Sequence, residues 1–415
     1  MHKNSIENDL LIEIQVEQKT QQALENRPSH AMLSGSEASA HEVNMAHSDA
    51  SLPLSTTWRE REHAPRRGVL ILEDGSEFEG TSFGYVGETA GEVVFSTGMV
   101  GYPEALTDAS FSGQILTMTY PIVGNYGVPE SSLWESDRIH VAGLIVSNYV
   151  AQPSHFQSTM NLGTWLQRER IPALEIKDTR LLTRHIRQHG TLLGKIVFDD
   201  DIPFYDPNTG NLVAQVSTSE VQEQGSGDLT IALIDCGAKR NIARSLLARN
   251  MRVITLPWDY DLFPASFAFD GIVISNGPGN PKMVGKTIRT IRAALERKIP
   301  TLGICLGHQL LALAAGGDTY KLKFGHRSQN QPCLLYEQGQ ATRRCYITTQ
   351  NHGFAVGTLP PAFTPWFVNA NDGSNEGMRH HTLPFLSVQF HPEATPGPLD
   401  TAWIFDSFLE QVKAK

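Results

Sequence analysis

The sequence lacks any apolar run that approaches the ~20 residues needed to cross a bilayer as a helix. Its first residues, MHKNSIENDLLIEIQ, carry acidic groups throughout and lack an apolar core followed by a small-residue cleavage site. We therefore expect no membrane span and no secretory signal, and we expect the protein in the cytoplasm.

Cysteine and positive charge are also scarce. The 415 residues include four cysteines, none in a C-x-x-C pair, so we expect reduced thiols of which at most one or two have a special role. The formal net charge of −10 argues against nucleic acid as the main partner, because binding phosphates requires a basic face. With 40% hydrophobic and 19% charged residues, the chain is long enough for two globular domains and a tail.

The first half of the chain changes character near residue 66. Residues 1–65 are rich in Ser, Glu, Gln, Asn and His, and this composition predicts a disordered extension. Residues 66–215 open with alternating apolar and polar residues around Asp74-Gly75, a hairpin signal, and continue with short strand-like runs and two helical patterns. This segment predicts a smaller, mixed α/β domain.

The second half of the chain has a different pattern of apolar and polar residues. Residues 216–228 are polar and contain Gly-Ser-Gly, which predicts a linker. Residues 229–415 alternate nearly continuous apolar runs with helical patterns, and this order is typical of a parallel sheet covered on both faces by helices. We expect an α/β domain with a mostly parallel sheet and an antiparallel excursion around 320–370.

The sharpest local signal is GICLGHQ, residues 303–309, where a buried-strand pattern runs through Gly-x-Cys-x-Gly into a helix. This is the cysteine form of the nucleophile elbow, in which the glycines permit a tight strand-to-helix turn that pushes Cys305 out of the sheet. The N-terminal N–H groups of the following helix favour the thiolate. A buried structural cysteine is the alternative, but the two glycines and the strand–helix context favour a nucleophile.

A nucleophilic cysteine needs a base and a group that orients the base. The strand-like run PFLSVQF ends at His391-Pro392-Glu393, where the fixed backbone of Pro392 lets the histidine and the carboxylate project together. We predict that His391 is the base and that Glu393 fixes its tautomer. Seen alone, such a tripeptide is more often a surface turn. HIRQH at 185–189 lacks the glutamate of a zinc-protease helix, and we expect no metal site in this chain.

The third element is the loop SNGPGNP, residues 275–281, after the run DGIVIS. We assign the backbone N–H groups of Gly277 and Leu306 to an oxyanion hole. The adjacent stretch NPKMVGKT almost matches a phosphate-binding P-loop, but Asn280 replaces its first glycine, so we do not assign a nucleotide site.

Together, the GPG loop, the G-x-C-x-G elbow and the His-Pro-Glu run resemble class I glutamine amidotransferases over most of residues 229–410. The resemblance implies hydrolysis of the glutamine amide through a γ-glutamyl thioester, with Cys305, His391 and Glu393 as the catalytic triad. Asn280 stands where aspartate is common, and Asn can make the same turn and cap contacts.

The first domain resembles that of the carbamoyl-phosphate synthase small chain, through LEDGSEFEG, GEVVFSTGMVGYPEALTD and DTRLLTRHIRQHGTLLGKI, and the likeness covers nearly everything from Gly68 onward. It differs at FGHRSQNQP, where some members have His-Gly-Gly. It implies a glutamine pocket made of Ser110, Gly277, Gly279, Leu306, Gln309, Asn351, Gly353 and Phe354. Ser110 would bring the first domain into the active site of the second.

The resemblance further implies a partner. Carbamoyl phosphate formation needs ATP and bicarbonate, so we expect no cofactor in this chain and expect a separate large chain to use ATP and a divalent metal. The two chains would form a heterodimer, or a higher assembly of heterodimers, that channels ammonia for arginine or pyrimidine synthesis.

Three alternatives remain open from the sequence. A sister amidotransferase of anthranilate or aminodeoxychorismate synthesis would share the triad but lack the first domain. A stand-alone Cys-His γ-glutamyl hydrolase would show high glutaminase activity without a partner. A non-catalytic glutamine-binding regulatory module would not need the intact triad.

Overall fold

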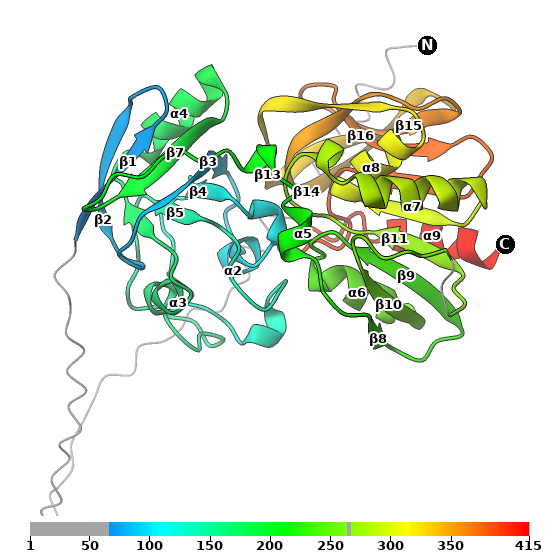
Figure 1. Ribbon diagram of the computed structural model, residues 1–415, viewed down its shortest axis with the longest axis horizontal. Helices are drawn as coiled ribbons and strands as arrows, with labels where there is room; N and C mark the ends of the chain where they lie inside the picture. Colours follow the sequence, from blue (N-terminus) through cyan, green and yellow to red (C-terminus); the bar gives the residue numbers. More distant parts are fainter. Residues whose placement is uncertain (1–65, 264–266, 415) are drawn as a thin grey trace, which may run out of the picture. The chain divides into compact units, whose positions relative to one another are not determined.

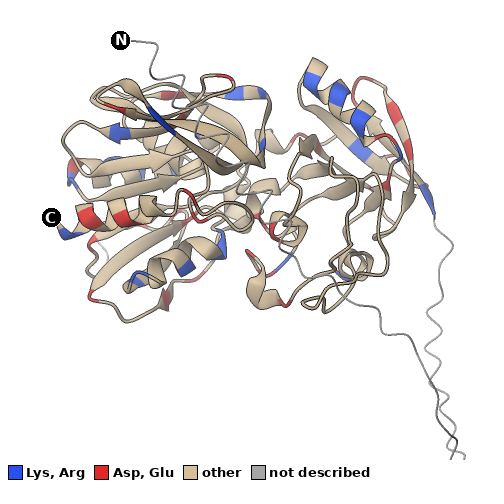
Figure 2. Ribbon diagram, turned by 180° about the vertical axis from the view of Figure 1, so that it is seen from behind, with Lys and Arg blue, Asp and Glu red and all other residues tan. Residues whose placement is uncertain are grey.

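The computed structural model describes residues 66–263 and 267–414 (Figure 1). The expected disordered extension, 1–65, lies outside the described residues. Among the described residues, no helix is both long enough and apolar enough to cross a membrane. Acidic and basic side chains are interspersed along the described chain, and one helix, α4 (Thr179–His189), carries three arginines (Figure 2).

Seven short strands close into a barrel in the order β1-β2-β6-β5-β4-β3-β7. Their bounds are β1 Arg67–Leu72, β2 Glu77–Ser82, β3 Thr89–Ser96, β4 Gln114–Met118, β5 Gly143–Val146, β6 Ala173–Glu175 and β7 Leu192–Val197. The helices of this part are α2 (Tyr102–Leu106), α3 (Leu162–Arg168) and α4, with 3-10 turns η1 (Ala109–Phe111), η2 (Ser131–Leu133) and η3 (Pro207–Thr209).

The hairpin expected around Asp74-Gly75 is present, because β1 and β2 pair antiparallel and Gly75 has a φ of 85° in the turn. The mixture of strands and helices in this part was also expected. The closure of the strands into a barrel was not, since closure depends on contacts such as β3 with β7, far apart in the sequence.

Ten strands form a second sheet in the order β14-β13-β15-β16-β17-β12-β11-β9-β10-β8. Their bounds are β8 Gln222–Gln224, β9 Leu229–Asp235, β10 Met251–Pro257, β11 Gly271–Ile274, β12 Thr301–Ile304, β13 Asp318–Glu337, β14 Gln340–Thr358, β15 Phe363–Asn369, β16 Asn375–His380 and β17 Phe385–Val388. The helices are α5 (Val213–Val216), α6 (Arg240–Leu247), α7 (Gly285–Glu296), α8 (Leu306–Ala314) and α9 (Trp403–Lys413), with one 3-10 turn, η4 (Pro281–Met283).

The strands β10, β9, β11, β12 and β17 run parallel to one another. Side chains of β9 alternate between two cores: Ile231 packs in the core that includes α6 and α9, and Ala232 packs in the core that includes α7 and α8. Helices therefore cover both faces, and the predicted α/β class is confirmed. The antiparallel excursion expected around 320–370 is also present, as β13 to β16.

The segment 216–228, predicted to be a linker, does more than connect. Its residues Gln222–Gln224 form β8, which pairs antiparallel with β10 at the edge of the large sheet. Without β8, this edge of β10 would leave N–H and C=O groups unpaired, and a polar segment can satisfy them without burying its side chains. The described residues form one compact unit, so the boundaries at 215 and 229 stay predictions.

Candidate active site

Cys305 lies in the turn between β12 and α8. Its backbone has φ 55° and ψ −103°, a conformation that costs an L-residue about 1–3 kcal/mol and that tends to persist at functional sites. The flanking glycines are required by close packing, because a Cβ on Gly303 would meet the carbonyl oxygen of Gly307 at 2.5 Å. A Cβ on Gly307 would meet the carbonyl oxygen of Ile274 at 2.2 Å. Close backbone packing therefore holds the strained elbow in place, inside the elbow at Gly303 and against the end of β11 at Gly307.

His391 and Glu393 follow the end of β17 and are almost fully buried. Nδ1 of His391 lies 2.6 Å from Oε1 of Glu393. Within the described residues, Nε2 of His391 has no hydrogen-bond partner. Burial opposes a charge on His391, but the Glu393 carboxylate and the Cys305 sulfur more than reverse this and raise the pKa of the imidazole. The pair is therefore set up to hold an imidazolium beside the thiol.

Lys239 is a functional residue that the sequence analysis missed. Its ammonium lies 3.2 Å from Oε1 of Glu393 and also donates to the carbonyl of Ala394. Burial raises the pKa of Glu393, but Lys239 and then His391 outweigh burial and lower it. Lys239 therefore keeps the orienting carboxylate ionised although it is buried. Its position in IDCGAKRNI, after β9, gave no local signal, since the contact spans 154 residues of chain.

The thiol of Cys305 has two polar neighbours besides the triad. Its sulfur lies 3.7 Å from the carbonyl oxygen of Asn351 and 3.7 Å from Nε2 of Gln389. Gln389 was also missed from the sequence, although it stands two residues before His391 on the same run. These contacts fix the sulfur from the side of β14 and β17.

A cavity opens beside Cys305, and all eight residues assigned to the glutamine pocket line it. They are Ser110, Gly277, Gly279, Leu306, Gln309, Asn351, Gly353 and Phe354. The side-chain NH₂ of Gln309 is held by the carbonyl of Phe354 at 2.8 Å and by Oε1 of Gln389 at 3.0 Å. Its oxygen is therefore the part of Gln309 that is oriented for a ligand.

The cavity also contains two charged side chains that the sequence analysis did not select, Glu92 from β3 and Arg327 from β13. Both are buried. Burial lowers the pKa of the Arg327 guanidinium, and the charges of Glu92 and Cys305 act against this. Oε1 of Glu92 already pairs with the ammonium of Lys321 at 2.6 Å. With that pair, the small polar cavity presents one buried guanidinium and one buried carboxylate, which complement a zwitterion with an ammonium and a carboxylate on one carbon.

Asp108, which lies between the barrel strands β3 and β4, hydrogen-bonds to residues on two sides of the cavity. Its carboxylate accepts from Nδ2 of Asn276 at 3.1 Å and from Nδ2 of Asn351 at 3.0 Å. Asn276 also donates to the hydroxyl of Ser110 at 3.0 Å. Ser110 thus reaches the cavity from the barrel, as the sequence analysis expected, and Asp108 anchors it by capping η1.

The loop after β11 has the geometry expected of it. The side chain of Asn280 accepts from the backbone N–H of Lys282, so Asn makes the cap contact that aspartate would make. In the P-loop-like stretch, Lys286 pairs with Asp259 at 2.9 Å and the hydroxyl of Thr287 donates to the carbonyl of Trp258. Both residues have protein partners and do not line the cavity.

A thiol on a strained strand–helix elbow, a buried His–Glu pair and a glycine-rich loop beside one cavity define a class I glutamine amidotransferase site. Residues 232–411 match the family described as glutamine amidotransferase class-I. Residues 70–196 match the carbamoyl-phosphate synthase small chain, CPSase domain.

The chain is 45% identical over 372 residues to the carbamoyl phosphate synthase arginine-specific small chain of Saccharomyces cerevisiae, with 84% of this chain and 90% of the yeast chain covered. It therefore belongs to the carbamoyl-phosphate synthase small-chain family.

Two longer relatives are also similar. The mitochondrial carbamoyl-phosphate synthase [ammonia] of Homo sapiens is 47% identical over 358 residues, which are 83% of this chain and 24% of the human protein. The multifunctional protein CAD of Squalus acanthias is 49% identical over 359 residues, 82% of this chain and 16% of that protein. The chain thus spans a quarter or less of the length of these two relatives.

Proposed function

We propose that the chain is the glutaminase subunit of a glutamine-hydrolysing carbamoyl-phosphate synthase. The observation that carries the proposal is the strained Cys305 elbow, which opens into a polar cavity beside the His391–Glu393 pair. This arrangement suits a small zwitterion with a side-chain amide.

The chemistry follows from the charges around the thiol. His391 takes the proton of the Cys305 thiol and becomes an imidazolium. The sulfur attacks the amide carbon of L-glutamine, and the N–H groups of Gly277 and Leu306 receive the developing oxyanion. The imidazolium of His391 gives its proton to the leaving nitrogen, and ammonia departs. Neutral His391 then removes a proton from water, which attacks the γ-glutamyl thioester and releases glutamate.

The cavity residues divide the recognition of glutamine. Both charged side chains line the cavity, and we propose that Arg327 binds the α-carboxylate and Glu92 the α-ammonium, while Ser110 and Gln309 contribute neutral polar contacts. Phe354 lines the same cavity and can cover the methylene stem. We propose that glycines 277, 279 and 353 let backbone groups approach the ligand.

The ammonia needs a second active site that uses ATP and bicarbonate. We propose that a separate large chain supplies that site with its ATP and divalent metal, in a cytoplasmic heterodimer or an assembly of heterodimers. A channel between the chains would keep ammonia unprotonated and nucleophilic. The product would serve arginine or pyrimidine synthesis.

The test is Cys305→Ser, measured in the assembled complex with a candidate large chain. We expect glutamine-driven carbamoyl phosphate synthesis to fall by about 10³-fold or more, because a serine hydroxyl is a far poorer nucleophile beside a base suited to thiol. Synthesis from added ammonium salt should persist. The matched control is Cys345→Ser, which removes an exposed thiol and should leave both reactions intact.

Each other outcome has a defined meaning. Surviving glutamine-driven synthesis in Cys305→Ser would remove the triad assignment. Loss of both reactions in an assembled complex would make Cys305 a structural residue. Rapid glutamine hydrolysis by the wild-type chain alone, unaffected by any large chain, would favour a stand-alone γ-glutamyl hydrolase.

A further inference from the structure

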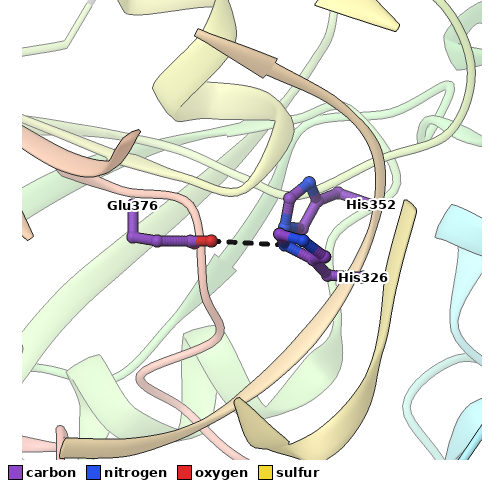
Figure 3. A group of neighbouring side chains, drawn as sticks. All are labelled: His326, His352 and Glu376. Carbon is purple, nitrogen blue, oxygen red and sulfur yellow. Dashed lines mark ion pairs between the residues drawn. The ribbon is translucent and has the colours of Figure 1, made fainter. Parts of the chain in front are cut away.

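A second group of buried, chemically active side chains lies outside the triad. His326 of β13 and His352 of β14 are direct partners in the antiparallel ladder, so their side chains project from the same face of the sheet. Glu376 of β16 approaches the two rings (Figure 3). One ligand atom from each of the three residues lies within 4.8 Å of the other two, and all three residues are buried.

The outer hydrogen bonds of the two rings are those of metal-binding histidines. Nε2 of His326 lies 2.9 Å from Oδ2 of Asp372, and Nδ1 of His352 lies 2.8 Å from the carbonyl oxygen of Phe354. Histidine ligands usually donate their second N–H to a carboxylate or a carbonyl in this way, which fixes the tautomer and the ring. Among the described residues, Nδ1 of His326 has no hydrogen-bond partner, and Nε2 of His352 contacts only Oε1 of Gln350, at 3.1 Å, so these two nitrogens are the ones left for an ion.

The two carboxylate oxygens of Glu376 differ: one accepts hydrogen bonds, and the other has no partner among the described residues. Its carboxylate accepts from Nδ2 of Asn369 at 3.0 Å and from the hydroxyl of Ser374 at 3.2 Å, both at Oε1. Oε2 is buried and has no hydrogen-bond partner among the described residues. An unpartnered oxygen on a fully buried carboxylate is unfavourable, and a cation bound by both oxygens of this carboxylate would satisfy Oε2 while Oε1 keeps its donors.

The spacing also fits an ion. Oε1 of Glu376 lies 3.3 Å from Nδ1 of His326. Two ligands at opposite ends of a tetrahedral edge around Zn²⁺ stand about 3.4 Å apart, given metal–ligand distances of about 2.0–2.1 Å. The three donor atoms lie within 4.8 Å of one another, so the donor on His352 needs to approach the others by up to about 1.4 Å, which a side-chain rotation can supply.

We propose that His326, His352 and Glu376 form a binding site for a divalent transition-metal ion of the zinc type. Two imidazoles and one carboxylate make a three-ligand set that leaves a fourth position for water. Oε1 of Gln350, 3.1 Å from Nε2 of His352, is a second candidate for that position. The sequence analysis expected no metal, because the three ligands are separated by more than twenty residues each and form no spacing motif.

The site adjoins the glutamine cavity. His352 lines that cavity, and its neighbour Asn351 places a carbonyl oxygen 3.7 Å from the sulfur of Cys305. An ion held by His352 would therefore fix the segment of β14 that forms one wall of the cavity. This consequence, a change in glutamine KM on metal binding, rests on the proposed function, whereas the binding of the ion does not.

The experiment uses the untagged full chain, stripped with a chelator. Zn²⁺ affinity is measured by competition with a chromophoric chelator, and Co²⁺ is added separately to record its ligand-field absorption. We expect one equivalent of Zn²⁺ per chain and a tetrahedral Co²⁺ spectrum. Asp372→Asn should weaken binding by about 10–100-fold, the usual effect of losing an outer partner. His326→Gln and Glu376→Gln should weaken it further.

The matched control is His140→Gln. His140 is a half-buried histidine whose ring nitrogens, among the described residues, hydrogen-bond only to the hydroxyls of Ser112 and Ser136, so this variant should bind Zn²⁺ as the wild type does. Thermal melting gives a second readout: Zn²⁺ should raise the Tm of the wild type but not of Glu376→Gln. Equal Zn²⁺ affinity in the wild type and His326→Gln would overturn the proposal and leave a His326–Glu376 ion pair only. These readouts need no glutamine chemistry, so this proposal and the glutaminase proposal can fail separately.

Discussion

Two buried His–Glu pairs, one within the large sheet and one just after its strand β17, have different surroundings. In both, Nδ1 of the histidine faces Oε1 of the glutamate, at 2.6 Å for His391–Glu393 and at 3.3 Å for His326–Glu376. Glu393 is further paired with the cation of Lys239. Glu376 is held instead by neutral donors and keeps an oxygen without a partner among the described residues.

The outer nitrogens of the two histidines differ as well. Nε2 of His391 has no hydrogen-bond partner among the described residues and is free for proton transfer with Cys305. Nε2 of His326 is already bonded to Asp372. The same two residue types therefore suit two tasks. A His–Glu pair whose outer nitrogen is free beside a thiol can transfer a proton. A His–Glu pair whose outer nitrogen is already hydrogen-bonded can bind an ion through its inner atoms. The neighbours, and not the pair, decide the chemistry.

Replacing each of the two histidines by asparagine tests this comparison with the largest expected effect on turnover. In the metal-free complex, His391→Asn should lower glutamine-driven turnover by about 10³-fold or more, because no other group can move the proton. His326→Asn should keep at least about a tenth of the activity, since a hydrogen-bonding side chain of similar width remains. Steady-state kinetics with glutamine checks both variants. Comparable losses in the two would erase the distinction between the pairs.

Exchanging each carboxylate is the next test. Glu393→Gln should lower turnover by about 10²-fold, less than His391→Asn, because Glu393 orients and stabilises the imidazolium without transferring the proton. Glu393 raises the pKa of His391, so its removal lowers that pKa. The imidazolium that protonates the leaving nitrogen is then lost at a lower pH, and the alkaline limb of the kcat profile should move to lower pH. An alkaline limb that stays in place would show that Glu393 does not set the charge of His391. Glu376→Gln in metal-free protein should leave the position of this limb unchanged.

Arg327 follows His326 in β13 and tests whether neighbouring residues serve separate sites. Arg327→Met should raise the KM for glutamine by about 10–100-fold, the range expected when a charged hydrogen bond is lost, with a smaller effect on kcat. The control is Arg343→Met, an exposed arginine on β14 that does not line the cavity. If both variants had the wild-type KM, Arg327 would not receive the α-carboxylate.

Short sequence motifs predicted much of this site, and the residues that were missed show which kind of residue such motifs cannot predict. Cys305 and the His391–Glu393 pair stand in short motifs whose turn geometry follows from glycine and proline, so both were predicted. Lys239 and Asp108 act through contacts that exist only after the chain folds, the first with Glu393 and the second with Asn276 and Asn351.

The fold also has parts that the sequence predicted and parts that it did not. The parallel strands were readable because each is a short apolar run between helices, as in β9 and β11. The closure of the barrel and the addition of β8 were not, because each depends on hydrogen bonds to a strand elsewhere in the chain. Long-range pairing leaves little trace in the pattern of one segment.

Ser110 provides the smallest and most selective test, because it enters the cavity from the barrel while both His–Glu pairs lie in or just after strands of the large sheet. Ser110→Ala should raise the KM for glutamine by about 2–10-fold, the effect of losing one neutral hydrogen bond, and should change kcat less. Ser112→Ala is the matched control: it removes a hydroxyl two residues away that contacts His140 and does not line the cavity, so its KM should equal that of the wild type. Titration of the initial rate against glutamine for the two variants separates them. A wild-type KM in Ser110→Ala would mean that the Ser110 hydroxyl makes no contact with the substrate, and among the residues assigned to glutamine here only Glu92 would then represent the barrel in the cavity.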